Sequence, residues 1–150
     1  MHFLTAEIER RRKTEPSDNT QAGVPAPLAL FALAFLQLIR FDYLLARGRF
    51  SELYDAVRKS SLQLPCAGTD TVKRITAAVD SASICYWKPV LCLQHSAATA
   101  CLLKRFGIPA QLVIGARQKP FKAHAWVEVN GCVVNDKSYT PEMFGVLDRC

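Results

Sequence analysis

The spacing of apolar residues changes once along this chain, close to Gly107, and no other feature constrains the fold as strongly. From Leu28 to Phe106 apolar residues recur at helical spacing, whereas beyond Gly107 they fall in short alternating or β-branched runs. A group of helices followed by a group of strands is the order typical of an α+β domain with an antiparallel sheet. We therefore predict helices in the first part of the chain and a sheet in the second.

Capping and breaking residues divide the first part into four helical segments. Gly48 is expected to stop the first helix, and Gly107 is expected at the C′ position of the last one, with Pro109 after it. The predicted helices are 28–47, 52–59 with Ser51 as N-cap, a third between Thr69 as cap and Pro89, and 91–106.

Three strands are expected after the helices, at QLVIGA (111–116), AWVEV (125–129) and CVVND (132–136). ARQKPFK (116–122) is predicted as a loop, and Asn130-Gly131 as a hairpin turn. The 150 residues are enough for one compact domain. We divide it into a flexible N-terminal segment (1–25), a helical N-terminal part (26–65) and a core (66–150).

Composition argues against several classes of protein. The net charge of +6 comes from basic residues that are scattered and not interleaved with aromatic ones, so no nucleic-acid partner is expected. The apolar run 27–39 is shorter than the roughly 18 to 20 residues that span a bilayer, so a membrane span is not expected. Six cysteines without a CxxC pair or a signal peptide favour a reduced, cytoplasmic protein without metal or cofactor.

Cys92, in LCLQHS, is the best placed of the cysteines for chemistry. It falls in the first turn of the predicted helix 91–106, where unpaired backbone N–H groups and the helix dipole favour a thiolate. The same N–H groups could hold the oxyanion formed when a carbonyl is attacked. The chain has three histidines, His2, His95 and His124, so the choice of a base is narrow.

The turn at Asn130-Gly131 decides which residue lies opposite His124. A two-residue turn would pair Ala125 with Asp136, whereas a three-residue loop with Gly131 in a G1 bulge would pair His124 with Asp136 and put Val133 beside Val127 on the core face. We predict the three-residue loop because it gives the carboxylate a partner. Asp136 then orients His124, and Cys92, His124 and Asp136 form a triad for acyl transfer through a thioester.

The segment CLQHSAATACLLKRFGIPAQLVIGARQKPFKAHAWVEVNGCVVND resembles the transglutaminase-like leader peptidases of lasso-peptide biosynthesis in their standalone form. The resemblance implies a papain-like, transglutaminase-like fold, with residues 66–150 as the catalytic core and Cys92, His124 and Asp136 as catalytic residues. It implies removal of the leader from a lasso precursor peptide, with a separate leader-recognition protein and an ATP-dependent lasso cyclase as partners. The family commonly has arginine where this chain has His95.

Other readings stay open at the level of sequence. Cys66, Cys85, Cys101, Cys132 and Cys150 are read as buried apolar residues. His95 could compete as the base, or ligate zinc together with Cys92, His124 and Cys132. Transglutaminase-like acyl transfer to an amine, or a non-catalytic module that presents a peptide, would use the same segment. Substrate contacts are expected at Trp126, Phe121, Arg117 and His95.

Overall fold

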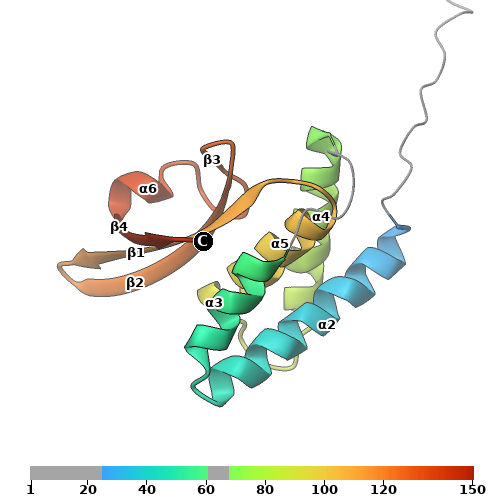
Figure 1. Ribbon diagram of the computed structural model, residues 1–150, viewed down its shortest axis with the longest axis horizontal. Helices are drawn as coiled ribbons and strands as arrows, with labels where there is room; N and C mark the ends of the chain where they lie inside the picture. Colours follow the sequence, from blue (N-terminus) through green and yellow to red (C-terminus); the bar gives the residue numbers. More distant parts are fainter. Residues whose placement is uncertain (1–24, 61–67) are drawn as a thin grey trace, which may run out of the picture.

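Helices form one layer of the molecule and an antiparallel sheet forms the other (Figure 1). The computed structural model describes residues 25–60 and 68–150, so the expectations for His2, Cys66, residues 1–24 and residues 61–67 lie outside the described part. The predicted α+β order is confirmed. The helical layer consists of α2 (Pro27–Ala46), α3 (Phe50–Lys59), α4 (Thr69–Ile84) and α5 (Cys92–Arg105).

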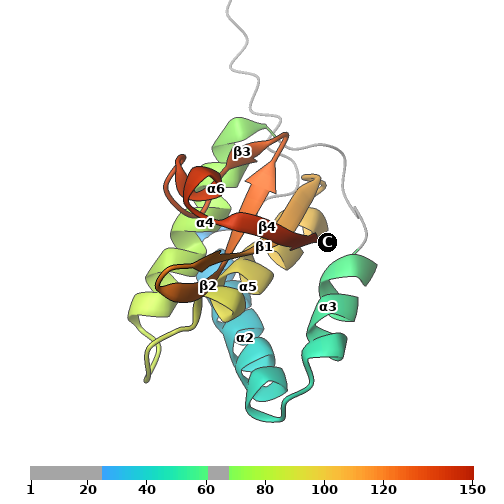
Figure 2. The ribbon, with the colours of Figure 1, turned by 90° about the vertical axis from the view of Figure 1, so that its left-hand side faces the viewer.

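Helix α5 lies between the sheet and the other helices, as the view with the sheet in front shows (Figure 2). Its sequence explains this position, because residues 96–103 are small or apolar and every one of them is buried. The helix ends in a Schellman motif in which Ile108 N–H reaches Leu103 O at 2.9 Å and Gly107 N–H reaches Lys104 O at 3.1 Å. Gly107 has φ +78°, as its predicted C′ position requires.

Helix α2 covers α4 and α5 with one apolar face. Its buried residues recur at helical spacing: Leu30, Ala34, Leu38, Phe41 and Leu44. At 20 residues and a mean hydropathy of 1.8, α2 is longer than the apolar run seen in the sequence, and among the described residues it is the one helix long and apolar enough to cross a membrane. Length and composition alone are weak evidence for a span, because the core helix of a soluble protein meets the same test.

Two predicted helix caps are wrong by one or two positions. The N-cap of α3 is Arg49, not Ser51, and the N-cap of α4 is Gly68, not Thr69. Neither cap residue makes a side-chain capping hydrogen bond, so the packing of Leu53 and Val57 in α3, and of Ile75 in α4, fixes where these helices lie. Helix α4 ends at Ile84, five residues before Pro89.

The sheet has four strands in the order β3-β2-β1-β4, all antiparallel. Strands β1 (Ala110–Gln118) and β2 (Phe121–Val129) pair along their whole length, so the predicted loop 116–122 is strand on both sides of the two-residue turn Lys119-Pro120. Strand β3 is short (Cys132–Val133). The short helix α6 (Thr140–Met143) and the strand β4 (Gly145–Arg149) were not predicted.

Both faces of β2 are buried, although the sequence predicted one core face. Ala125 and Val127 pack against the helices, as expected. On the other face Trp126 is fully buried with Val113 and Phe144. Glu128 is also buried there, accepting a hydrogen bond from Trp126 Nε1 at 2.8 Å and pairing with Arg149 of β4. The unpredicted C-terminal segment thus covers the face of β2 that carries Trp126.

Gly115 in β1 is required by the Trp126 ring. A Cβ at Gly115 would lie 2.8 Å from Trp126 Cη2 and 3.0 Å from Gly145 O, closer than side chains tolerate. We expect Gly115→Ala to destabilise the protein by about 1–3 kcal/mol, because the buried indole cannot move aside. Thermal unfolding measures this.

Gly145→Ala is the matched control, since its Cβ would meet Ala116 O at an ordinary 3.5 Å. Equal melting temperatures of the two variants would contradict the role given to Trp126.

Candidate active site

Cys92, His124 and Asp136 line one pocket of about 420 Å³ at the start of α5. Cys92 is the first residue of α5 and is exposed to solvent. His124 comes from β2 and Asp136 from the segment after β3. The remaining lining residues are Ser83, Ile84, Val90, His95, Ser96, Ala125 and Asn135.

The hairpin that carries His124 and Asp136 has the register that we had rejected. Val129 pairs with Cys132 and Glu128 with Val133, which leaves a two-residue turn at Asn130-Gly131. Both turn residues have positive φ, +51° and +77°, as a type I′ turn requires. The predicted three-residue loop is therefore wrong, and Val133 lies on the Trp126 side, not beside Val127.

Asp136 nevertheless meets His124, because the chain leaves the strand after Val133. Val134 N–H still bonds Val127 O at 3.0 Å, but the Asn135 side chain, not a backbone carbonyl, accepts the hydrogen bond from Val127 N–H at 2.7 Å. The backbone bends there and brings the Asp136 carboxylate to His124 Nε2, with which it forms a hydrogen bond.

Partial burial alone would raise the pKa of the Asp136 carboxyl, but the hydrogen bonds that this carboxylate accepts together lower the pKa by more. They come from His124, from Lys137 N–H at 2.7 Å and from Thr140, and together they hold the pKa of Asp136 below its usual range. The carboxylate is thus ionised at neutral pH beside the imidazole. His124 keeps Nδ1 for another partner, because Asp136 occupies Nε2.

Gln94 anchors the start of α5. Its side chain is almost fully buried; Nε2 donates to Leu38 O of α2 at 2.9 Å, and Oε1 accepts from Leu91 N–H at 3.3 Å. The first intrahelical hydrogen bond of α5 runs from His95 N–H to Leu91 O. The N–H groups of the first turn, including that of Cys92, therefore have no intrahelical partner and can hold an anion beside the thiol.

Ser96 and Asn135 connect the three elements of the site, and sequence reasoning missed both. Ser96 Oγ donates to Ala125 O at 2.9 Å and accepts from Asn135 Nδ2 at 2.9 Å. Ser96 lies one helical turn after Cys92, and Asn135 directly precedes Asp136. Those spacings were the available signal, but the hairpin register needed to interpret them was wrong.

Of the four residues expected to contact substrate, His95 lines the pocket and the other three do not. His95 lines it, but both ring nitrogens have partners: Nε2 contacts Asp80 at 2.9 Å and Nδ1 contacts Asn135 at 3.4 Å. Trp126 is fully buried behind His124, so its expected substrate contact is wrong. Phe121 is exposed at the tip of the β1–β2 hairpin, and Arg117 stacks on Phe144; neither lines the pocket.

The other described cysteines do not all have the buried environment that we predicted. Cys85 and Cys132 are exposed, which corrects that prediction. Cys101 is buried and Cys150 is partly buried, and for both thiols burial raises the pKa. Within residues 25–60 and 68–150 no three His, Cys, Asp or Glu side chains are grouped so that they could hold a metal ion.

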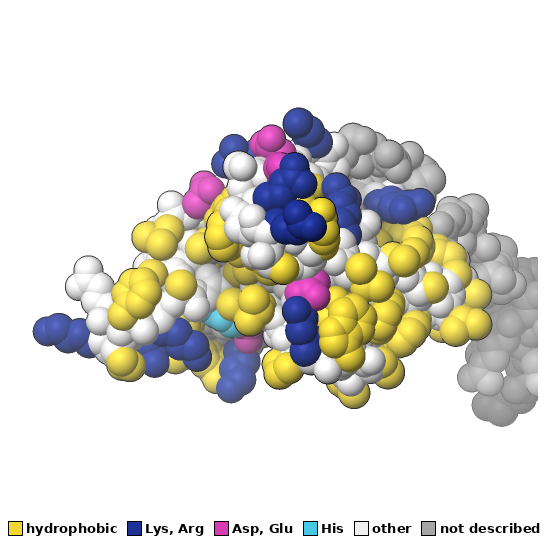
Figure 3. Space-filling model, turned by 90° about the horizontal axis from the view of Figure 1, so that it is seen from below, with side chains coloured by type: hydrophobic (Ala, Val, Ile, Leu, Met, Phe, Trp, Pro, Cys, Tyr) yellow, Lys and Arg dark blue, Asp and Glu magenta, His cyan; other side chains and the backbone are white. Residues whose placement is uncertain are grey.

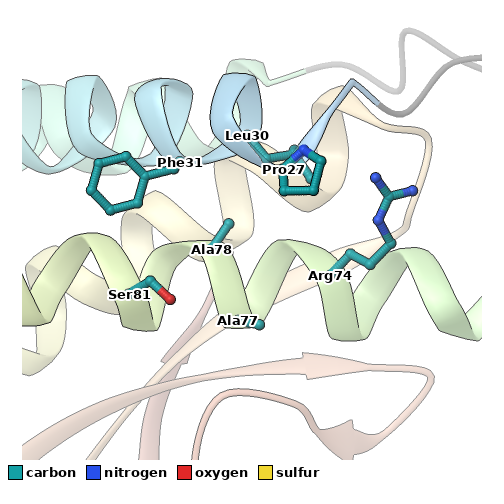
Figure 4. Close-up of a pocket in the computed structure, with 7 residues that line it drawn as sticks. All are labelled: Pro27, Leu30, Phe31, Arg74, Ala77, Ala78 and Ser81. Atoms are coloured by element: carbon teal, nitrogen blue, oxygen red, sulfur yellow. The ribbon is translucent and has the colours of Figure 1, made fainter.

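A second cavity, of about 310 Å³, opens between α2 and α4 (Figure 4), and Cys92 does not line it. It is largely apolar and is lined by Pro27, Leu30, Phe31, Arg74, Ala77, Ala78 and Ser81. On the face of the molecule seen in Figure 3, basic side chains occupy several separate places among apolar ones. Among the described residues, that face shows no single basic surface of the kind that binds nucleic acids.

Comparison with known proteins gives two matches. A family model described as the transglutaminase-like superfamily matches residues 35–149. The Microcin J25-processing protein McjB of Escherichia coli is 51% identical over 56 residues, which are 37% of this chain and 27% of that protein. The matched stretch therefore spans about a quarter of the relative's length. No solved structure gives a significant match.

Proposed function

The chain belongs to the transglutaminase-like superfamily, and we propose that it is a cysteine peptidase that removes the leader from a ribosomally made lasso-peptide precursor. The observation that carries the proposal is the pocket in which an exposed cysteine at a helix start lies with a histidine already bonded to a carboxylate. This arrangement supports nucleophilic catalysis, because thiol, base and orienting group come together. The partial match to a microcin-processing protein supports the choice of substrate.

In the proposed mechanism His124 Nδ1 accepts the proton of the Cys92 thiol, and Sγ attacks the carbonyl carbon of the scissile peptide bond. The oxygen of the tetrahedral intermediate accepts hydrogen bonds from the N–H groups at the start of α5. His124 then returns its proton to the leaving amine, and the C–N bond breaks to leave a thioester on Cys92. Asp136 accepts the hydrogen bond from Nε2–H throughout and stabilises the imidazolium.

Water completes the cycle. His124 takes a proton from the water, the oxygen attacks the thioester, and the thiol leaves with the proton returned to it. An amine in place of water would give transglutaminase-like acyl transfer with the same triad. We favour hydrolysis because the resemblance to the leader peptidases is the more specific one, and the product masses distinguish the two outcomes.

The proposed partners follow from the same resemblance. The precursor peptide is the substrate, a separate leader-recognition protein presents it, and an ATP-dependent cyclase closes the ring after cleavage. We place the reaction in the cytoplasm, where thiols stay reduced. No metal or cofactor is needed for the proposed steps.

Iodoacetamide at pH 6 tests whether Cys92 is activated. Cys85 and Cys132 are exposed, like Cys92, but lie outside the pocket, so they are matched internal controls. We expect Cys92 to react at least about tenfold faster than either, because it lies at a helix start and shares its pocket with His124, which can accept the thiol proton. Peptide mapping of the alkylated sites gives the rates. Equal rates at the three cysteines would favour a non-catalytic peptide-presenting module instead.

A further inference from the structure

We propose that His95 is a positioning residue: held by Asp80, it fixes Asn135 and through Asn135 the carboxylate of Asp136. The proposal rests on the proposed peptidase function, because it concerns how the same site is kept in order. It assigns a role to a second histidine–carboxylate pair that spans from α4 to the pocket.

The directions of the hydrogen bonds can be worked out from Val127. Its backbone N–H can only donate, so the Asn135 atom that it reaches at 2.7 Å must be the carbonyl oxygen Oδ1. The other atom of the amide is then Nδ2, a donor. Ser96 Oγ accepts from it at 2.9 Å while its own proton goes to Ala125 O.

The second proton of Asn135 Nδ2 points to His95 Nδ1, at 3.4 Å. A donor facing this nitrogen requires His95 Nδ1 to carry no proton. The proton of the neutral ring is therefore on Nε2, where it donates to Asp80 Oδ1 at 2.9 Å. Asp80 thus selects the tautomer of His95 in which Nδ1 can accept from Asn135.

The His95–Asp80 pair can position the residues of the site without taking part in the reaction. The His95 side chain is 18% exposed, whereas the side chain of Asp80 is 60% exposed on α4. Both ring nitrogens of His95 have partners, so neither is left for the thiol of Cys92, and His95 is not the base. Asn135 is the residue around which the chain leaves β3, so a loose Asn135 would let Asp136 move away from His124.

Two substitutions of His95 separate its two contacts. In His95→Asn the amide oxygen takes the place of Nδ1 and can still accept from Asn135. In His95→Gln the amide nitrogen takes the place of Nε2, so the contact with Asp80 stays and the acceptor for Asn135 is lost. Positioning through Asn135 predicts that His95→Gln is the more damaging variant, although it is closer to histidine in length.

The experiment measures kcat and KM for precursor cleavage in the presence of the recognition protein. We expect His95→Gln to lower kcat about 10-fold with KM within about twofold of the wild type, and His95→Asn to lose less than about threefold of kcat. In an Asn135→Ala background, adding His95→Gln should cost little more, because both act through one contact. Equal losses in the two variants, additive losses, or a change confined to KM would overturn the proposal.

The alkylation rate of Cys92 at pH 6 tests the role of His95 without a precursor peptide. His95→Gln should slow the alkylation of Cys92 at least about threefold and His95→Asn should slow it less, because only the former loosens the histidine that activates the thiol. If the wild type labels selectively but cleaves no precursor, the proposed substrate is wrong and the order of the two variants still decides the role of His95. Identical alkylation rates in wild type, His95→Gln and His95→Asn would overturn it.

Discussion

Asp136→Ala is expected to lower kcat for precursor cleavage by about 10²- to 10⁴-fold, with the protein still folded. Asp136 accepts the hydrogen bond from His124 Nε2. Without it the imidazole can turn, its proton can move to Nδ1, and the imidazolium loses its counter-charge. Asp136→Asn should lose about as much, because Lys137 N–H can only donate and therefore keeps the amide oxygen at its own contact. The amide nitrogen, a donor, then faces His124 Nε2 and forces the imidazole proton onto Nδ1.

Asp55→Ala is the control for removing a carboxylate. Asp55 lies on the exposed side of α3, where it pairs with Lys59 at 3.7 Å, and it does not line the pocket. Steady-state cleavage rates of the three variants are measured together with their thermal unfolding, which shows whether each variant is folded. If Asp136→Ala and Asp55→Ala cleave equally fast, Asp136 is not the group that orients His124.

The start of α5 was predictable because local signals determine it. The apolar run that follows Cys92 and the Gly107 stop are properties of neighbouring residues, and the helix begins at Cys92, one residue after the predicted start. The strands β1 and β2 were found for the same reason, since their β-branched residues and alternation are local. The ends of α3 and α4 were misplaced because packing, not a capping side chain, fixes them.

For the hairpin, the predicted contact between His124 and Asp136 is present, but the turn from which we predicted it is wrong. We rejected the two-residue turn because it would put Asp136 opposite Ala125 in a regular strand. The strand is not regular that far: it ends at Val133, and Asn135 takes the hydrogen bond that a backbone group would have taken. A bend made by one side chain carries no periodic signal, so the sequence could not predict it.

The face of β2 that carries Trp126 was misjudged because its cover comes from residues far away in the chain. Phe144 and Arg149 belong to a C-terminal segment with little apolar periodicity. Its strand β4 is exposed at every residue, so no alternation marked it. Gln94 was missed for a related reason, since a buried glutamine is explained only by Leu38 O on another helix.

Cys92→Ala is expected to have the largest effect of any single substitution, a loss on the order of 10⁴-fold or more in cleavage rate. The mechanism passes through a bond to Sγ, so the substitution removes the nucleophile itself. Stability should change little, since Cys92 is exposed at the first position of α5. Cys132→Ala, which removes an exposed cysteine outside the pocket, is the matched control.

Mass spectrometry of the precursor, incubated with the recognition protein and either wild type, Cys92→Ala or Cys132→Ala, tests the central claim most directly. We expect wild type and Cys132→Ala to give two fragments whose masses sum to the precursor plus one water, and Cys92→Ala to leave the precursor intact. Cleavage by Cys92→Ala at the wild-type rate would contradict the account.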